Sequence, residues 1–141
     1  MNTSHRLSRI VSASFAAATL SLLGNSAFAA ELKLSGANEV PPVTTSAAGT
    51  GSIAVAPDGA VSGSVKSTGV EGTMAHIHTA APGKNGPVII PLTKGADGEW
   101  AVPAGAKLTD EQMKSYKAGD LYVNVHSAEH KGGEIRAQLK P

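Results

Sequence analysis

Two histidines that lie two residues apart are the first residues in this sequence whose spacing suggests chemistry. His76 and His78 lie in segment 73–79, whose alternating pattern predicts a β-strand. Since alternate side chains of a strand project to the same face, we expect Ala75 and Ile77 to face the core. Both imidazoles should then lie on the opposite, outer face, where they could bind one metal ion together.

A second pair of histidines lies near the C-terminus. His126 ends a segment in which Val123 and Val125 are expected to face the core, so its imidazole should also lie on the outer face. His130 follows in a glycine-containing loop. Every histidine after residue 29 therefore belongs to one of two short clusters.

We predict that the two clusters together form a metal site. The predicted ligands are His76, His78 and His126, and Met74 and His130 are further candidate ligands. Imidazole binds copper, zinc, nickel and iron well, and a thioether favours cuprous copper, whereas calcium and magnesium require oxygen ligands. Copper is therefore the preferred ion. Zinc held by three imidazoles is the second choice, and non-haem iron would need a carboxylate beside two histidines.

Residues 1–29 have the features of a secretory signal peptide. Two arginines precede a fourteen-residue apolar run, 10–23, which is shorter than the roughly 20 residues that span a membrane. The small residues Ala27 and Ala29 then form the Ala-x-Ala pattern of a cleavage site. We therefore predict cleavage near Ala29 and a mature domain, 30–141, that is periplasmic or secreted and has no membrane anchor.

Composition excludes several kinds of site. The 141-residue chain has no cysteine, which excludes disulfides, thiolate metal sites and cysteine nucleophiles. Its formal net charge is +1, and after residue 29 ten basic residues stand against eleven acidic ones. A chain so close to neutrality is not expected to bind nucleic acid. No phenylalanine remains after residue 29, so we expect a core of Val, Ile, Leu and Ala.

The rest of the pattern predicts an all-β domain with one short helix. Turn residues Pro57-Asp58-Gly59 separate two alternating segments and predict a hairpin. Thr109 and Gln112 form a capping-box pattern and Gly119 follows, which predicts a helix within 108–118. The expected strands are 50–56, 61–65, 73–79, 88–92, 99–102, 121–126 and 135–139. Short strands at this spacing are typical of a small antiparallel Greek-key sandwich or barrel.

Motifs along the whole mature chain carry a family resemblance. In chain order they are Glu39-Val40-Pro41-Pro42-Val43, Ala75-His76-Ile77-His78 with Ala81-Pro82-Gly83 and Asn85-Gly86-Pro87-Val88, Leu121-Tyr122-Val123-Asn124-Val125-His126, and Gly133-Glu134-Ile135-Arg136. Together they resemble the CHRD domain, which is named for chordin and also occurs in bacterial secreted proteins. This resemblance implies a secreted, β-rich domain.

The histidine pattern also resembles the copper site of Cu,Zn superoxide dismutase. His76, His78 and His126 match the copper ligands of that enzyme in type and order. Arg136 matches the arginine that guides the superoxide anion. The resemblance implies a superoxide-dismutase-like or immunoglobulin-like fold with a copper site. The chain lacks that enzyme's disulfide cysteines, its zinc-ligand loop and a counterpart of its bridging histidine.

Three functions follow from these patterns and stay open at this point. The first is a copper-binding protein for buffering, transfer or tolerance, with a copper donor or acceptor protein as its partner. The second is a superoxide-dismutase-like redox enzyme, in which Arg136 on the outer face would steer small anions. The third is a metal-free adhesion or protein-interaction module, whose histidines are ordinary surface residues.

Overall fold

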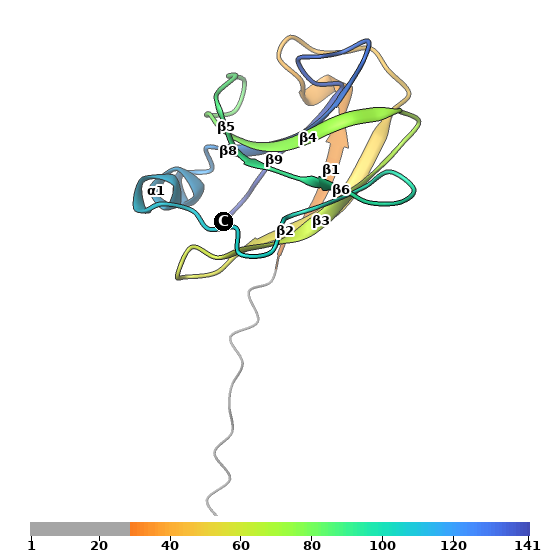
Figure 1. Ribbon diagram of the computed structural model, residues 1–141. Coiled ribbons are helices and arrows are strands. Elements are labelled where there is room, and N and C mark those ends of the chain that lie inside the picture. Colours follow the sequence, from red (N-terminus) through yellow and green to blue (C-terminus); the bar gives the residue numbers. More distant parts are fainter. Residues whose placement is uncertain (1–28) are drawn as a thin grey trace, which may run out of the picture.

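The strands of the domain form one continuous antiparallel sheet. The structure is a computed structural model and describes residues 29–141 (Figure 1). Its strands are β1 (Glu31–Ser35), β2 (Ala48–Val55), β3 (Val61–Thr68), β4 (Gly72–Thr79), β5 (Val88–Pro91), β6 (Thr93–Lys94), β7 (Glu99–Ala101), β8 (Leu121–Ser127) and β9 (Ile135–Gln138). The 3₁₀ turn η1 (Gly36–Asn38) follows β1, and the helix α1 (Asp110–Ala118) precedes β8. Neighbouring strands pair in the order β5-β4-β8-β9-β1-β2-β3-β7-β6.

The segment that contains β5 and β6 brings the two ends of the sheet together. β5 pairs with β4, and the Leu92 amide then donates to the Ala75 carbonyl at 2.9 Å. β6 pairs with β7, and the Lys94 ammonium donates to the Gly72 carbonyl at 2.7 Å. Because β4 and β7 lie near opposite ends of the sheet, this segment nearly closes it into a barrel. The predicted all-β antiparallel fold with one short helix is therefore confirmed.

Aliphatic side chains fill the barrel, as the composition predicts. The inward positions of the strands around the site are Leu32, Leu34, Ala75, Ile77, Leu121, Val123, Val125, Ile135 and Ala137, and all are buried. Trp100 joins them, and its indole N–H donates to Ser67 Oγ at 3.2 Å. Burial of a large aliphatic side chain contributes about 1.5–3 kcal/mol, so this inner face holds β4 and β8 firmly in place.

The helix begins and ends where its capping residues predict. Thr109 Oγ1 accepts a hydrogen bond from the Gln112 amide at 3.2 Å, and Gln112 Oε1 accepts one from the Thr109 amide at 2.9 Å. Gly119 ends the helix in the left-handed conformation, with φ at 81°. The chain then enters β8 at Leu121.

The structure differs from the sequence prediction at three strands. β1 and β6 were not predicted; β1 is short and is held by pairing with both β2 and β9, and β6 has only two residues. β8 was expected to have one buried face, but all of its residues are buried. Val123 and Val125 reach the core as predicted, and loops rather than solvent cover the opposite face.

The predicted signal peptide lies outside the residues that the structure describes, so its cleavage near Ala29 stays a prediction. Within 29–141, no helix is both long enough and apolar enough to span a bilayer.

Candidate metal centre

Pairing between β4 and β8 brings three histidines together. His76 and His78 project from one face of β4, and Asn124 of β8 lies opposite His76. His126 lies two residues further along the same face of β8. One ring nitrogen from each of the three histidines lies within 4.8 Å of the other two. These are the histidines that the sequence pattern grouped, and at this separation they could hold one metal ion.

Backbone carbonyls orient two of the three rings. His126 Nδ1 lies 2.8 Å from the Lys131 carbonyl oxygen, and His78 Nδ1 lies 2.9 Å from the Gly86 carbonyl oxygen. Since a carbonyl only accepts, both Nδ1 atoms carry the proton and the Nε2 atoms of the neutral rings present lone pairs. A bond of this kind to the second nitrogen orients metal-binding histidines and sets their tautomer.

The His76 ring closes the group. His76 Nδ1 lies 3.0 Å from His126 Nε2. Because His126 Nε2 presents a lone pair, His76 donates this hydrogen bond while both rings are neutral. If the His76 proton moved from Nδ1 to Nε2, the other tautomer of the neutral ring, two nitrogen lone pairs would face one point, which is what a metal ion requires.

His78 has a buried nitrogen without a partner. Its Nε2 atom is buried and makes no hydrogen bond. An unpaired buried polar atom costs about 1–3 kcal/mol. A metal ion bound at Nε2 would remove this cost, so the donor set fits such an ion.

Burial lowers the pKa of both His76 and His78. For His76, burial is the largest cause, followed by repulsion from the other two histidines. For His78, burial is again the largest cause, and the hydrogen bond to Gly86 acts in the opposite direction. The neutral imidazole is the form that binds metal, so both shifts keep these rings ready to bind at neutral pH.

Three loops cover the outer face of β4, β8 and β9, and we call them together the roof. They are segments 39–43, 80–87 and 128–134 (Figure 1). Asn85 Nδ2 donates to the Val40 carbonyl at 2.7 Å, which joins the first two segments. The carbonyls of Gly86 and Lys131, which orient His78 and His126, belong to the second and third.

The roof corrects one prediction about the histidines. The strand face is as expected, since Ala75 and Ile77 are in the core and the imidazoles project from the other side. His78 and His126 are nevertheless only 7% and 5% exposed, so they are not surface residues. His76 is half-buried and more open than the other two.

Tyr122 lies between His78 and Arg136. Its ring is parallel to that of His78, with 4.7 Å between centroids and 4° between planes. The guanidinium carbon of Arg136 lies 3.4 Å from the Tyr122 ring centroid. Because β4 and β9 flank β8 on opposite sides, the tyrosine ring is held between them. Its hydroxyl accepts from the Gly86 amide at 3.3 Å, which ties this stack to the roof.

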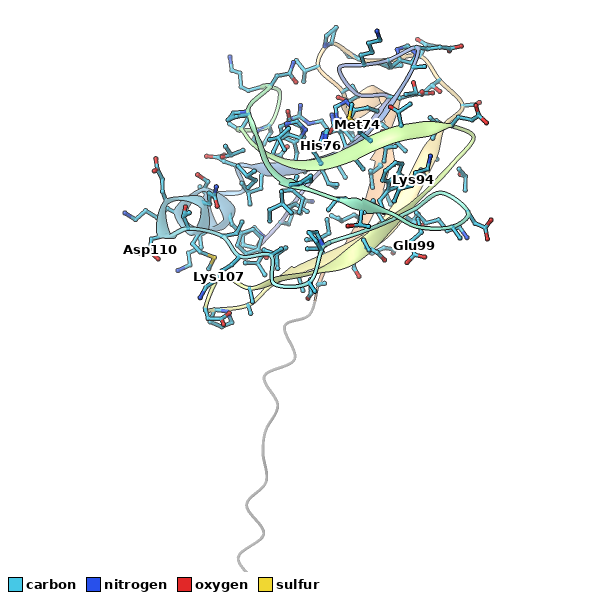
Figure 2. The ribbon with its side chains drawn as sticks, viewed as in Figure 1. Met74, His76, Lys94, Glu99, Lys107 and Asp110 are labelled. Carbon is cyan, nitrogen blue, oxygen red and sulfur yellow. The ribbon has the colours of Figure 1, made fainter. Side chains whose placement is uncertain are left out.

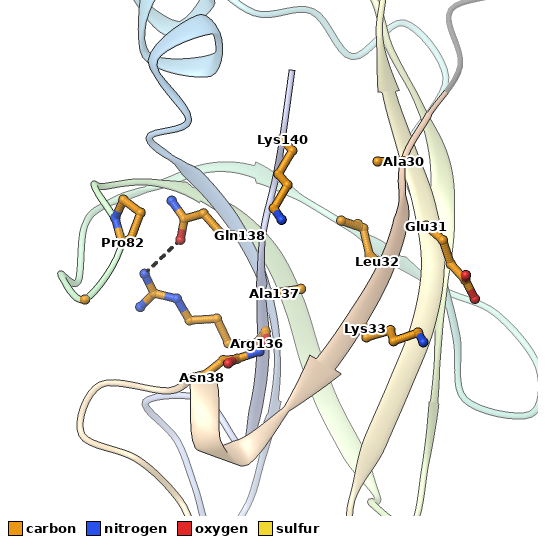
Figure 3. A pocket seen from close by; sticks show the side chains of 11 residues that line it. Ala30, Glu31, Leu32, Lys33, Asn38, Pro82, Arg136, Ala137, Gln138 and Lys140 are labelled. Carbon is orange, nitrogen blue, oxygen red and sulfur yellow. Dashed lines mark hydrogen bonds between the residues drawn. The ribbon is translucent and has the colours of Figure 1, made fainter.

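Arg136 is not the exposed cation that the sequence comparison led us to expect. It is 2% exposed, and it donates to Asn85 Oδ1 at 3.1 Å and to the Lys84 carbonyl at 2.8 Å. Figure 3 shows it beside Gln138, on the wall of a groove of about 560 Å³ along β1 and β9. A buried guanidinium must satisfy its donors locally, so Arg136 fastens the roof to the sheet.

Met74 and His130 lie at the margins of the three-histidine group. Met74 projects from β4 two residues before His76 and lies opposite His126 in the pairing (Figure 2). Its side chain is 51% exposed, so the thioether lies at the solvent edge of the site. His130 lies in the roof and is not one of the three histidines within 4.8 Å of one another. Metal binding by either residue stays a prediction.

Two buried polar residues beside the histidines were missed in the sequence. Asn124 is 1% exposed and Glu39 is 4% exposed. Asn124 had a signal, because it lies two residues before His126 and therefore on the same strand face. Glu39 begins one of the family motifs, but nothing in that loop segment predicts its place at the site, which it reaches only in the folded chain. Buried polar side chains without full pairing are rare and need an explanation.

Fold and site together define the class of this protein. It is an antiparallel β-barrel that carries a roofed cluster of three histidines on its outer face. The CHRD domain model matches residues 30–139, so this chain belongs to the CHRD domain family. The family resemblance seen in the sequence is therefore confirmed. Comparison with curated proteins and with solved structures gave no match.

Proposed function

We propose that this CHRD protein is exported and binds one copper ion through His76, His78 and His126. Its role would be copper buffering, transfer or tolerance. The proposal rests on one observation: three ring nitrogens lie within 4.8 Å of one another while backbone carbonyls orient two of the rings. Export rests on the charged, apolar and small-residue regions of segment 1–29.

The donor set favours copper over zinc. Among the divalent first-row metals, copper binds a given set of nitrogen ligands most tightly. The Met74 thioether at the edge of the site would add affinity for cuprous copper. Bound copper would supply a positive charge and a one-electron redox couple, and the neutral imidazoles would hold it in place.

A gradient of exposure supports metal transfer. Met74 is exposed, His76 is half-buried, and His78 and His126 are buried. An ion would therefore enter and leave beside Met74 and His76. A copper donor or acceptor protein would exchange its ion at that edge of β4.

Titration of the exported, chelator-treated protein with cupric and cuprous ions in a calorimeter tests the proposal. We expect one site with a dissociation constant below about 1 µM, equivalent to about −8 kcal/mol. The His76→Ala/His78→Ala variant should lose more than about 100-fold in affinity, beyond the range typical of outer-shell changes. His130→Ala is the matched control, because it removes an imidazole near the site but outside the cluster.

Binding weaker than micromolar by the folded protein would reject the proposal, as would unchanged affinity in the double variant. Either result would favour the metal-free interaction module. Zinc is measured in the same way. A higher affinity for zinc than for cupric copper at equal pH would mean that the three-histidine site binds zinc rather than copper.

A further inference from the structure

Three buried side-chain atoms in the described residues have no hydrogen-bond partner. They are Glu39 Oε1, His78 Nε2 and Asn124 Oδ1. All three belong to the outer face of β4 and β8 or to the loop that covers it. Since each unpaired atom costs about 1–3 kcal/mol, the two on the strands, His78 Nε2 and Asn124 Oδ1, indicate a shared partner that would satisfy both.

Asn124 lies among the histidines on the strand. It is opposite His76 on β4 and two residues before His126 on β8. Side chains at these positions share one face and neighbour each other.

The orientation of the Asn124 amide follows from the contacts of its nitrogen. Asn124 Nδ2 donates to the Gly132 carbonyl at 3.4 Å. A Cβ on Gly133 would overlap with both Asn124 Nδ2 and Glu39 Oε1, so these two atoms flank the same glycine. The nitrogen is turned toward the loop, and the oxygen at the other end of the amide is buried without a partner on the strand face that carries the histidines.

Glu39 is placed to hold this amide. Its carboxylate can only accept when ionised, and the Asn124 N–H group is the donor beside it. Burial is the largest influence on the pKa of Glu39 and raises it, while the neighbouring Asn124 amide acts to lower it. A buried carboxyl beside a ligand's own side chain is the kind of group that orients metal ligands in proteins.

We propose that Asn124 Oδ1 is the fourth ligand of the metal ion held by His76, His78 and His126, with Glu39 as the positioning residue for its amide. This inference rests on the proposed function. An amide oxygen is a harder ligand than a thioether sulfur, in the sense of hard and soft metal ligands. Three imidazole nitrogens with an amide oxygen are therefore a harder set of ligands than three nitrogens with a thioether. The site would therefore favour cupric copper or zinc over cuprous copper, and Met74 would lie outside the inner ligand set.

Variants of Asn124 test the assignment through the ratio of cupric to cuprous affinity. We expect Asn124→Ala to weaken cupric binding by about 10–100-fold and cuprous binding by less than about threefold. Asn38→Ala is the matched control, because it removes an exposed amide that bonds the Arg136 carbonyl rather than facing the histidines.

Asn124→Asp keeps the shape of the side chain but loses the N–H group that donates to the Gly132 carbonyl, so its melting temperature is measured beside that of the alanine variant. Its carboxylate should tighten cupric binding by about tenfold and alter the cupric electron paramagnetic resonance spectrum. Ser62→Asp on β3 is the control for added charge. For the positioning role, Glu39→Ala should change that spectrum, and Glu39→Gln, which can still accept from the amide, should restore it.

The outcomes separate this inference from the proposed function. Normal copper binding by the parent protein with an unchanged spectrum and unchanged cupric affinity in Asn124→Asp would overturn Asn124 as a ligand and leave the three-histidine site standing. Equal losses of cupric and cuprous affinity in Asn124→Ala, with a normal melting temperature, would also overturn it. Failure of the parent protein to bind metal would reject both.

Discussion

The two outer faces of the barrel have the same alternating pattern and opposite surroundings. On β2 and β3, the outward residues Ser52, Ser62 and Lys66 are exposed. On β4 and β8, the outward residues His78 and His126 are buried. Alternation therefore predicts which side chains face the core, but it does not predict whether the other face meets water.

Loops account for the difference. The hairpin between β2 and β3 turns within Ala56–Ala60, where the Ala56 amide donates to the Ala60 carbonyl at 2.8 Å. The loops at segments 80–87 and 128–134 are longer and fold back over their strands. They supply the carbonyls that orient the histidines. The polar outer face of β4 and β8 becomes a candidate site because these two loops cover it.

The largest effect is expected from a methyl group inside the roof. A Cβ on Gly86 would overlap with the Thr79 carbonyl oxygen, so Gly86→Ala must displace the loop that holds His78. We expect a loss of about 3 kcal/mol in the free energy of unfolding, measured by urea denaturation. Gly132→Ala is the control, since nothing lies within 4 Å of its Cβ position. Equal stability of the two variants would contradict the role of Gly86.

Bound metal should stabilise the folded protein through the roofed face. A substitution on the open face should therefore leave this gain in stability unchanged. At a free copper concentration about 100 times the dissociation constant, linkage predicts a gain of about 2.7 kcal/mol. Removal of the ion with a chelator should reverse the gain, as followed by thermal melting. His78→Ala should abolish the shift, whereas Ser52→Ala on β2 should keep it. A copper-induced shift of the same size in His78→Ala would argue for binding elsewhere.

A third test compares a change of cation on each face, Arg136→Lys on the roofed face and Lys66→Arg on the open face. Arg136→Lys would remove the planar fork that donates to Asn85 and Lys84 and stacks on Tyr122. We expect a cost of about 2 kcal/mol, the range for charged hydrogen bonds. The reverse change on the open face, Lys66→Arg, should stay within about 0.5 kcal/mol. Comparable costs in chemical denaturation would show that the roof does not depend on Arg136.

The smallest expected effect depends on pH. Burial raises the pKa of Glu39 above its usual 4.5, so the folded chain keeps a proton there that the unfolded chain has lost. The stability that this group contributes is present below the usual pKa and is lost as pH rises through the raised value. The Glu39→Gln variant cannot ionise, so its stability should not fall with pH in this way. The substitution itself should cost less than about 1 kcal/mol of stability through altered hydrogen bonding.

Urea midpoints from pH 4 to pH 7, with a chelator present, would measure this effect. The Glu39→Gln variant should gain on the parent protein as pH rises. Parallel curves for the two proteins would mean that Glu39 does not carry the shift.

Much of the fold could be predicted from local patterns. Period-two alternation identified the inward faces of the strands that carry the histidines, and Thr109, Gln112 and Gly119 gave the ends of the helix. β1 was missed because its stability comes from two distant strands rather than from its own five residues. The burial of His78 and His126 was missed because the roof is held by contacts between distant residues, such as the hydrogen bond between Asn85 and Val40, which lie 45 positions apart.

The sequence by itself determined the strand faces, the helix caps, the family and the three histidines that come together, since all of these follow from periodicity, capping chemistry and ordered motifs. Only the tertiary structure decided that the histidines lie under loops and that Arg136 is buried and bonded to the roof. It also placed Glu39 and Asn124 beside the cluster. The physical reason is that exposure and pairing depend on contacts between residues far apart in the chain, which no local spacing records.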